Sequence, residues 1–293
     1  MSRSKPLWLG TEDPQARLRK IETMDLETQY REITQLFYAD FQSVMLTKGF
    51  NGFIFNNAAT RISRVLGSTG ELEHRIAKRV VDTTLLATAV MLHGFKADQG
   101  REAARRVNAM HSRYDIHPDD FLAVAAEETL GSLELAERYG WRHVTEKEQE
   151  ALRLYYNHQA RAFGSPKELP PSIAEVKLFF SHYLDTALSY EPQNKKLAQS
   201  LIKWYGERVP GPFRGFFRTL LLADLDPRII RACGLRQPLK IMTQLARLLL
   251  RRTGRKDPVP DGVPSGLEDL VHSVYPNGWT FDDLGGAKPK PAV

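Results

Sequence analysis

The stretch VVDTTLLATAVM, residues 80–91, constrains the fold most strongly, because wound as a helix it is apolar on nearly every side. A helix without a polar face is normally enclosed by other elements, so this stretch predicts a helix at the centre of the fold. It is far shorter than the roughly 20 residues that a membrane-spanning helix needs. Other helices must therefore cover it.

The remaining sequence supplies such helices. Apolar residues recur at spacings of three and four along most of the chain, and no convincing run alternates with the period of two typical of strands. Helix starts are marked by prolines such as Pro118 and by two capping boxes, Thr145 with Glu148 and Ser172 with Glu175. We expect a turn-rich break at 49–57 (GFNGFIFNN), and helices at 14–41, 58–66, 70–93, 100–114, 118–139, 145–163, 172–190 and 238–253.

These patterns predict an all-α fold, a single helical domain of about ten helices over residues 1–256. From residue 257 to residue 293 the chain is rich in Pro and Gly, so we expect a C-terminal tail with a frayed end. The single cysteine, Cys233, excludes an intramolecular disulfide and any multi-cysteine metal site. It suits a reducing compartment, and no signal peptide is recognisable, so we expect a cytoplasmic protein.

The net charge of +6 is a property of one segment, because residues 236–256 hold seven basic residues and no acidic one. In the helix expected at 238–253, an apolar face opposes a basic one. Three interpretations stay open: a core helix with a solvated basic face, peripheral contact with anionic lipid, and nucleic-acid binding. The last is the weakest because no aromatic residue interleaves with the basic ones, so we expect no nucleic-acid partner. The apolar face holds Ile241, Met242, Leu245, Leu248 and Leu249, and the basic face Lys240, Gln244, Arg247 and Arg251.

Several catalytic motifs are missing from the sequence, namely the phosphate-binding loop, the dinucleotide fingerprint, the serine elbow and HExxH. A di-iron centre needs two Glu-x-x-His pairs, and only Glu71 with His74 fits. Among the eight histidines, His111 differs because it lies late in a helix on the face of Val107 and Met110. Such an imidazole is either a hydrogen-bonded core residue or a ligand.

Arg79 and Thr83 pose a similar choice, since they share one face at the start of the apolar helix. Burying an arginine without a partner is costly. Its partner is either a carboxylate of the chain, such as Asp82 or Glu71, or an anionic group of a ligand, such as a haem propionate.

Residues 78–164 resemble the family of the latex-clearing proteins, or rubber oxygenases, which includes the fungal MpaB-type oxygenase that cleaves a farnesyl chain. The match is clear over 58–164 and extends to the basic helix. Its strongest features are Arg79-x-x-x-Thr83, VNAMHSRYDI around His111, HPDDF directly after it, and ERYGWR followed by TEKEQEA at 137–151.

The resemblance implies an all-helical domain with a globin-like core and one haem b. His111 would then be the proximal iron ligand, and Arg79 and Thr83 would be haem-pocket residues. Characterised members use O2 to cleave a carbon–carbon double bond of an isoprenoid chain. One departure concerns the distal side, where Asp82 stands in the place of a latex-clearing lysine that can ligate iron.

We therefore expect a haem b-dependent oxygenase that acts with O2 on an apolar small molecule, unsaturated or isoprenoid, and rubber itself is not its expected substrate. Arg79 and Asp82 are the candidate catalytic residues, which would orient O2 or handle protons. Iron chemistry would come from the cofactor, and the protein would supply the axial ligand and the surrounding polarity. The alternative is a non-catalytic helical protein that binds lipid or a membrane surface, with peripheral contact through helix 238–253.

Overall fold

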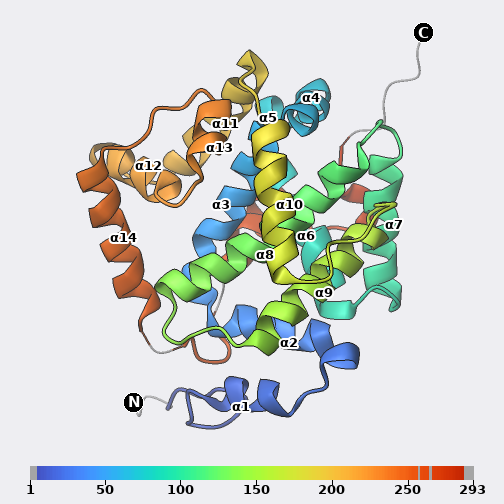
Figure 1. Ribbon diagram of the computed structural model, residues 1–293, viewed down its shortest axis with the longest axis vertical. Helices are drawn as coiled ribbons and strands as arrows, with labels where there is room; N and C mark the ends of the chain where they lie inside the picture. The colour runs from blue at the N-terminus through green and yellow to red at the C-terminus, as the bar shows by residue number, and fades with distance from the viewer. Residues whose placement is uncertain (1–4, 257, 264–265, 287–293) are drawn as a thin grey trace.

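Helix α8 (Pro118–Tyr139) is the longest helix of the described chain and lies at its centre (Figure 1). The computed structural model describes residues 5–256, 258–263 and 266–286, and within them it contains α-helices and short 3-10 helices but no strand. Pro118 begins α8 at the position where a missing N–H costs nothing. The all-α prediction is confirmed.

The helices around α8 form one half of the fold. α3 (Gln42–Ala58), α9 (Glu146–Ala162) and α10 (Ile173–Thr186) pack against it, and α2 (Leu26–Asp40) packs along α9. Both bonds of the capping box predicted for α9 are present. The other elements near this half are α1 (Ala16–Thr23), α4 (Thr60–Thr69), α11 (Pro192–Gly206), η1 (Gly211–Phe213), α12 (Arg214–Leu222), α13 (Pro227–Ala232) and α14 (Lys240–Gly254).

The apolar stretch that we expected at the centre forms α6 (Ile76–His93), which packs against α7 (Asp98–His111). One side of α6 is buried, and it carries Val81, Leu85 and Ala89. The opposite side, which includes Thr83 and Ala87, is only half-buried. α6 is therefore more peripheral than its sequence predicts, and the central position belongs to α8.

Three local predictions were wrong. The helix expected at 14–41 is divided into α1 and α2, because Met24 is extended and the side chain of Asp25 caps the start of α2. The expected break at 49–57 lies inside α3, where Phe50, Ile54 and Phe55 are fully buried and hold the Gly- and Asn-rich segment in a helix. The helix expected at 70–93 is interrupted at Arg75, whose backbone (φ −139°) separates α5 (Glu71–His74) from α6.

The tail expected after residue 256 is not wholly separate from the domain. α15 (Leu267–Val274) packs against α6, and η2 (Phe281–Asp283) packs against α7. Leu284 is fully buried with the apolar residues of those two helices. Apolar residues spaced among the Pro and Gly residues provide this packing. Most of the end that we expected to fray, 287–293, lies outside the described residues.

No helix of the described segments combines the length and the apolar character that crossing a bilayer requires.

Candidate functional site

His111 is the last residue of α7, and its ring is fixed by the end of another helix. Its Nδ1 lies 2.9 Å from the backbone oxygen of Phe163, the residue that follows α9. A carbonyl oxygen can only accept, so Nδ1 carries the proton and donates it. In the neutral ring Nε2 is therefore unprotonated and has a free lone pair, as an iron ligand requires.

The surroundings of His111 favour the neutral form of the ring. Burial lowers its pKa, and the positive charge of Arg79 lowers it further, while the hydrogen bond to Phe163 opposes both effects. The ring meets Phe121 edge to face with centroids 5.4 Å apart. A neutral imidazole held between aromatic rings favours ligation over proton storage.

Arg79 lies close enough to His111 to influence its charge, so the structure brings these two predicted residues together. The guanidinium donates to Thr83 Oγ1, one turn further along α6. Neither of the two expected carboxylate partners pairs with it in the described chain, because Glu71 binds Arg75 and Asp82 binds Lys78.

Loss of hydration lowers the pKa of Arg79, and the charges of Asp82 and Glu71 oppose this effect without a direct ion pair to Arg79. A guanidinium stays charged at any ordinary pH. A half-buried cation whose nearest polar partner is a threonine hydroxyl favours an anionic ligand group. This geometry supports the ligand interpretation of Arg79 over the internal salt bridge.

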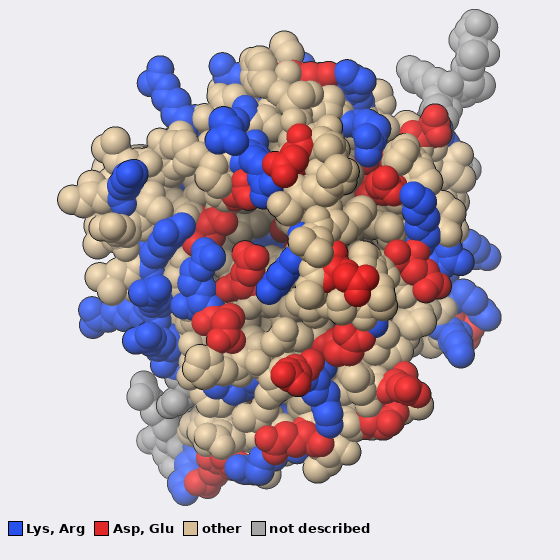
Figure 2. All heavy atoms as spheres, in the orientation of Figure 1, with Lys and Arg blue, Asp and Glu red and all other residues tan. Residues whose placement is uncertain are grey.

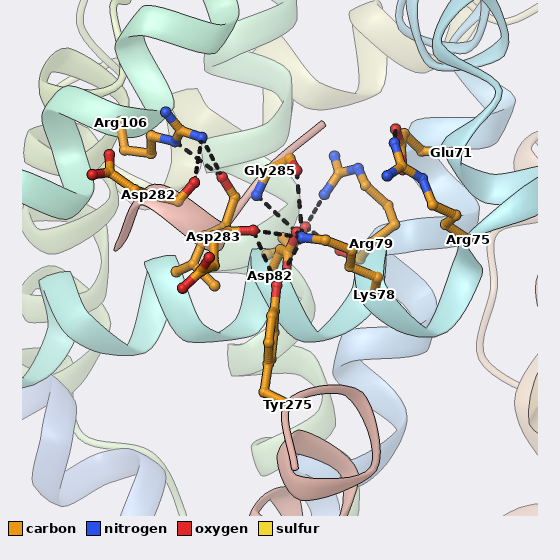
Figure 3. A network of polar contacts seen from close by, with 12 residues as sticks. Glu71, Arg75, Lys78, Arg79, Asp82, Arg106, Tyr275, Asp282, Asp283 and Gly285 are labelled. Atoms are coloured by element: carbon orange, nitrogen blue, oxygen red, sulfur yellow. Dashed lines mark hydrogen bonds and ion pairs between the residues drawn. The ribbon is translucent and has the colours of Figure 1, made fainter. Parts of the chain in front are cut away.

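Asp82 is buried on α6, and its two carboxylate oxygens are engaged by the C-terminal segment and by Lys78 (Figure 3). Lys78 Nζ lies 2.6 Å from Oδ2, and the backbone N–H of Gly285 donates to the same oxygen at 2.7 Å. The hydroxyl of Tyr275 donates to Oδ1 at 2.5 Å. These contacts make Asp82 an anchor for the chain that covers it, and the proton-handling role expected for it stays a prediction.

We call residues 266–286 the C-terminal cover. Besides Asp82, the cover is held by Arg106 of α7, whose guanidinium donates to the backbone oxygen of Leu284 at 2.8 and 2.9 Å (Figure 3). Lys78 also donates to the backbone oxygen of Asp283 at 2.7 Å. The cover reaches the histidine helix, since the Sδ atom of Met110 lies next to Gly285. Sequence patterns did not predict the C-terminal cover, because these contacts use backbone oxygens, which every residue type has.

A second polar cluster, also missed by the sequence, lies between α3 and α8. Buried Lys48 donates to Glu127 at 2.7 Å and to Glu128 at 3.0 Å. Burial raises the pKa of Glu127 to about 7, against the attraction of Lys48. The pKa of Lys48 is raised, because its two carboxylate partners outweigh burial. The cluster is a buried network of one lysine and two carboxylates, in which burial favours the protonated form of Glu127.

The other side chains that could ligate a metal ion do not form a cluster in the described part of the chain. Among the described residues, no three His, Cys, Asp or Glu side chains form a group that could hold a metal ion. Burial raises the pKa of the Cys233 thiol to about 12, so it stays protonated. A metal at this site would therefore depend on His111 together with ligands that a cofactor brings.

The comparisons with known proteins concern the fold and the family. No curated protein matches the chain by sequence. The fold is similar to the solved structure of latex clearing protein LCP in the closed state, with a TM-score of 0.56 and 19% identity over 88% of this chain and 76% of that one. Residues 37–255 match the model of the family described as ER-bound oxygenase mpaB/B′/Rubber oxygenase, catalytic domain. The chain thus belongs to this oxygenase family.

Proposed function

We propose that the protein is a haem b-dependent oxygenase in which His111 is the axial iron ligand. The observation that carries the proposal is the hydrogen bond from His111 Nδ1 to the Phe163 carbonyl, which leaves Nε2 free as a ligand. A ligating histidine characteristically donates its other ring N–H to such an acceptor, which fixes the tautomer and the orientation of the ring. Membership of the oxygenase family supports the assignment.

The residues around His111 fit a haem. Arg79 would pair with a propionate, because it is charged, half-buried and without a carboxylate partner among the described residues. Thr83 would orient that guanidinium through its hydroxyl. The bound haem supplies the iron that binds and activates O2. The protein's own contribution is to hold the iron through a neutral imidazole and to balance the negative charge beside it.

The proposed substrate is an apolar small molecule with a carbon–carbon double bond, isoprenoid in character, which is cleaved with O2. The family assignment supports this reaction class. Asp82 stands where the resembled latex-clearing proteins have a lysine, and its engaged oxygens hold the cover next to Met110. We infer that Asp82 acts on the reaction through the position of the cover, as a positioning residue.

The absorption spectrum of the purified protein tests the proposal directly. Protein produced with haem supplementation should show a Soret band and bind about one haem per chain. His111→Ala should lose that band while its circular dichroism stays helical. Adding free imidazole should restore part of the band, because it replaces the missing ligand in the same place. His143→Ala is the matched control, since the side chain of His143 is exposed and its ring contacts Glu137 on the surface.

Colourless wild-type protein under these conditions would refute the proposal. It would favour the alternative, a non-catalytic helical protein that binds lipid. Equal loss of haem from His111→Ala and His143→Ala would refute the assignment of the ligand but not of the cofactor. Arg79→Leu should keep the band and bind haem more weakly, whereas Arg79→Lys should recover part of the affinity by keeping the charge.

A further inference from the structure

Helix α14 contacts the rest of the protein along only a narrow line. Ala246 and Gly254 are buried, and Leu250 is half-buried. At Gly254 the approach is so close that a β-carbon would lie 2.1 Å from the backbone oxygen of Tyr139. Small residues thus let α14 lie directly on the end of α8, and most of its surface faces solvent.

The apolar side of α14 is consequently not in the core, contrary to the interpretation of a core helix with a solvated basic face. Ile241 is 74% exposed and Leu248 is 63% exposed. Leu239, directly before the helix, is 72% exposed. The side chains of Leu245 and Leu249 extend this strip. A row of large aliphatic side chains in water marks a surface that binds an apolar partner.

The basic side of α14 is solvent-exposed as well. Arg247 is tied to the protein, since it donates to the backbone oxygen of Ala223 at 2.8 Å and lies 3.3 Å from Asp224. Among the described residues, no ion pair includes any other basic residue of the segment 240–256. The cations that remain are Lys240, Arg251, Arg252, Arg255 and Lys256. Figure 2 shows Lys and Arg side chains gathered over α14 at the left of the molecule.

We propose that α14 is a docking surface for an anionic lipid bilayer. Its exposed leucines would enter the boundary between headgroups and acyl chains, and the flanking cations would meet the phosphate and carboxylate groups of the lipid. This is the arrangement of an interfacial amphipathic helix, which lies in the membrane surface and does not cross it. The inference is independent of haem binding.

The charge and apolar character of α14 favour an anionic bilayer over a second copy of the chain or a nucleic acid. A second copy of the chain would bring two unpaired basic strips together, and like charges oppose that contact. A nucleic acid would satisfy the cations but would leave the exposed Ile241 and Leu248 without an apolar partner. An anionic bilayer can bind both sides of α14 at once. Its charged headgroups meet the basic side chains, and its acyl chains, which begin directly below the headgroups, meet the apolar ones.

Vesicle flotation with the full chain tests the proposal. The protein should float with vesicles of 70% phosphatidylcholine and 30% phosphatidylserine at low salt, and at least about tenfold less with phosphatidylcholine alone. Arg251→Ala/Arg252→Ala should lower the partition coefficient about 25-fold, since each basic residue at the surface contributes about fivefold. It should also weaken the dependence on salt.

Leu245→Ser/Leu248→Ser should also lower the partition coefficient at least about tenfold, but with the salt dependence unchanged, because it removes the apolar part alone. The matched control is Leu178→Ser/Arg101→Ala, in which an exposed leucine of α10 and an exposed arginine of α7 are replaced and flotation should not change. All of these sites are exposed, so the variants should keep the circular dichroism of the wild type.

Three outcomes would overturn the proposal. Equal flotation with neutral and anionic vesicles would remove the electrostatic argument. Equal flotation of the α14 variants and the control would remove α14 from the contact. A dimer in sedimentation velocity that Leu245→Ser/Leu248→Ser dissolves, together with no vesicle binding, would assign the strip to a second copy of the chain.

Discussion

The hydroxyl of Tyr275 is a specific fastening point of the C-terminal cover, and its removal should open the cover without unfolding the protein. In Tyr275→Phe the ring and its packing remain. The bond to Asp82 Oδ1 (2.5 Å), the bond accepted from Lys78 Nζ (2.7 Å) and the longer contact with the Asp283 backbone oxygen (3.2 Å) are lost. A hydrogen bond to a charged group contributes about 1.5–3 kcal/mol. Asp82 keeps Lys78 and the Gly285 amide, so the net cost is about 2 kcal/mol.

A cost of about 2 kcal/mol corresponds to an opening constant about 30-fold larger, which hydrogen–deuterium exchange can measure. Peptides covering residues 267–286 should exchange faster, above all at Gly285, whose N–H donates to Asp82. Peptides from α8 should be unchanged. Tyr114→Phe is the control, because that tyrosine is exposed and its hydroxyl makes no hydrogen bond with other described residues. A uniform increase over the whole chain, or none in the cover, would refute the reasoning.

Two further predictions concern stability. Gly100→Ala should lower the free energy of unfolding by about 1–3 kcal/mol or more, because its β-carbon would lie 1.8 Å from the backbone oxygen of Gly94. Gly49→Ala, inside α3 with open space around it, should instead raise that free energy by about 1 kcal/mol, and urea unfolding that ranks the two variants the other way would contradict the packing. Glu127 binds its proton more tightly in the folded protein (pKa about 7) than in the unfolded chain (about 4.5), so its contribution to stability should fall as the pH rises through this window. Glu127→Gln should reduce the loss of stability between pH 4.5 and pH 7 by up to about 3 kcal/mol, and unchanged pH dependence would show that the carboxyl titrates elsewhere.

The sequence predicted best those helices whose ends are marked locally. α8 begins at Pro118 as expected, and α9 begins after the Thr145–Glu148 capping box, because both signals act within one turn. α3 was misread because Gly and Asn weaken a helix only by about 1 kcal/mol each, and burial of three large side chains outweighs that cost. Local propensity could not anticipate packing against α8.

The candidate site was predicted in part for a similar reason. The charge of Arg79 acts on His111, and the roles that the resemblance implies for both residues stay predictions. The partner of Asp82 could not be read from spacing. Lys78 and Arg79 are both within one turn of Asp82, and the structure pairs it with Lys78 because Tyr275 and Gly285 approach from the same side. The residues that favour Lys78 over Arg79 as the partner of Asp82 lie 193 and 203 positions further along the chain.

The C-terminal cover lies outside the part of the chain that the family model matches. The family match ends at residue 255, whereas every residue of the cover follows it. Asp82, inside the matched region, therefore takes two of its three hydrogen bonds from a stretch of chain that the family pattern does not include, and the third from Lys78. The helical core and the segment that covers it are therefore encoded in separate parts of the sequence. Substitutions after residue 265 can alter what lies over α6 and α7 while the histidine and arginine beneath stay as they are.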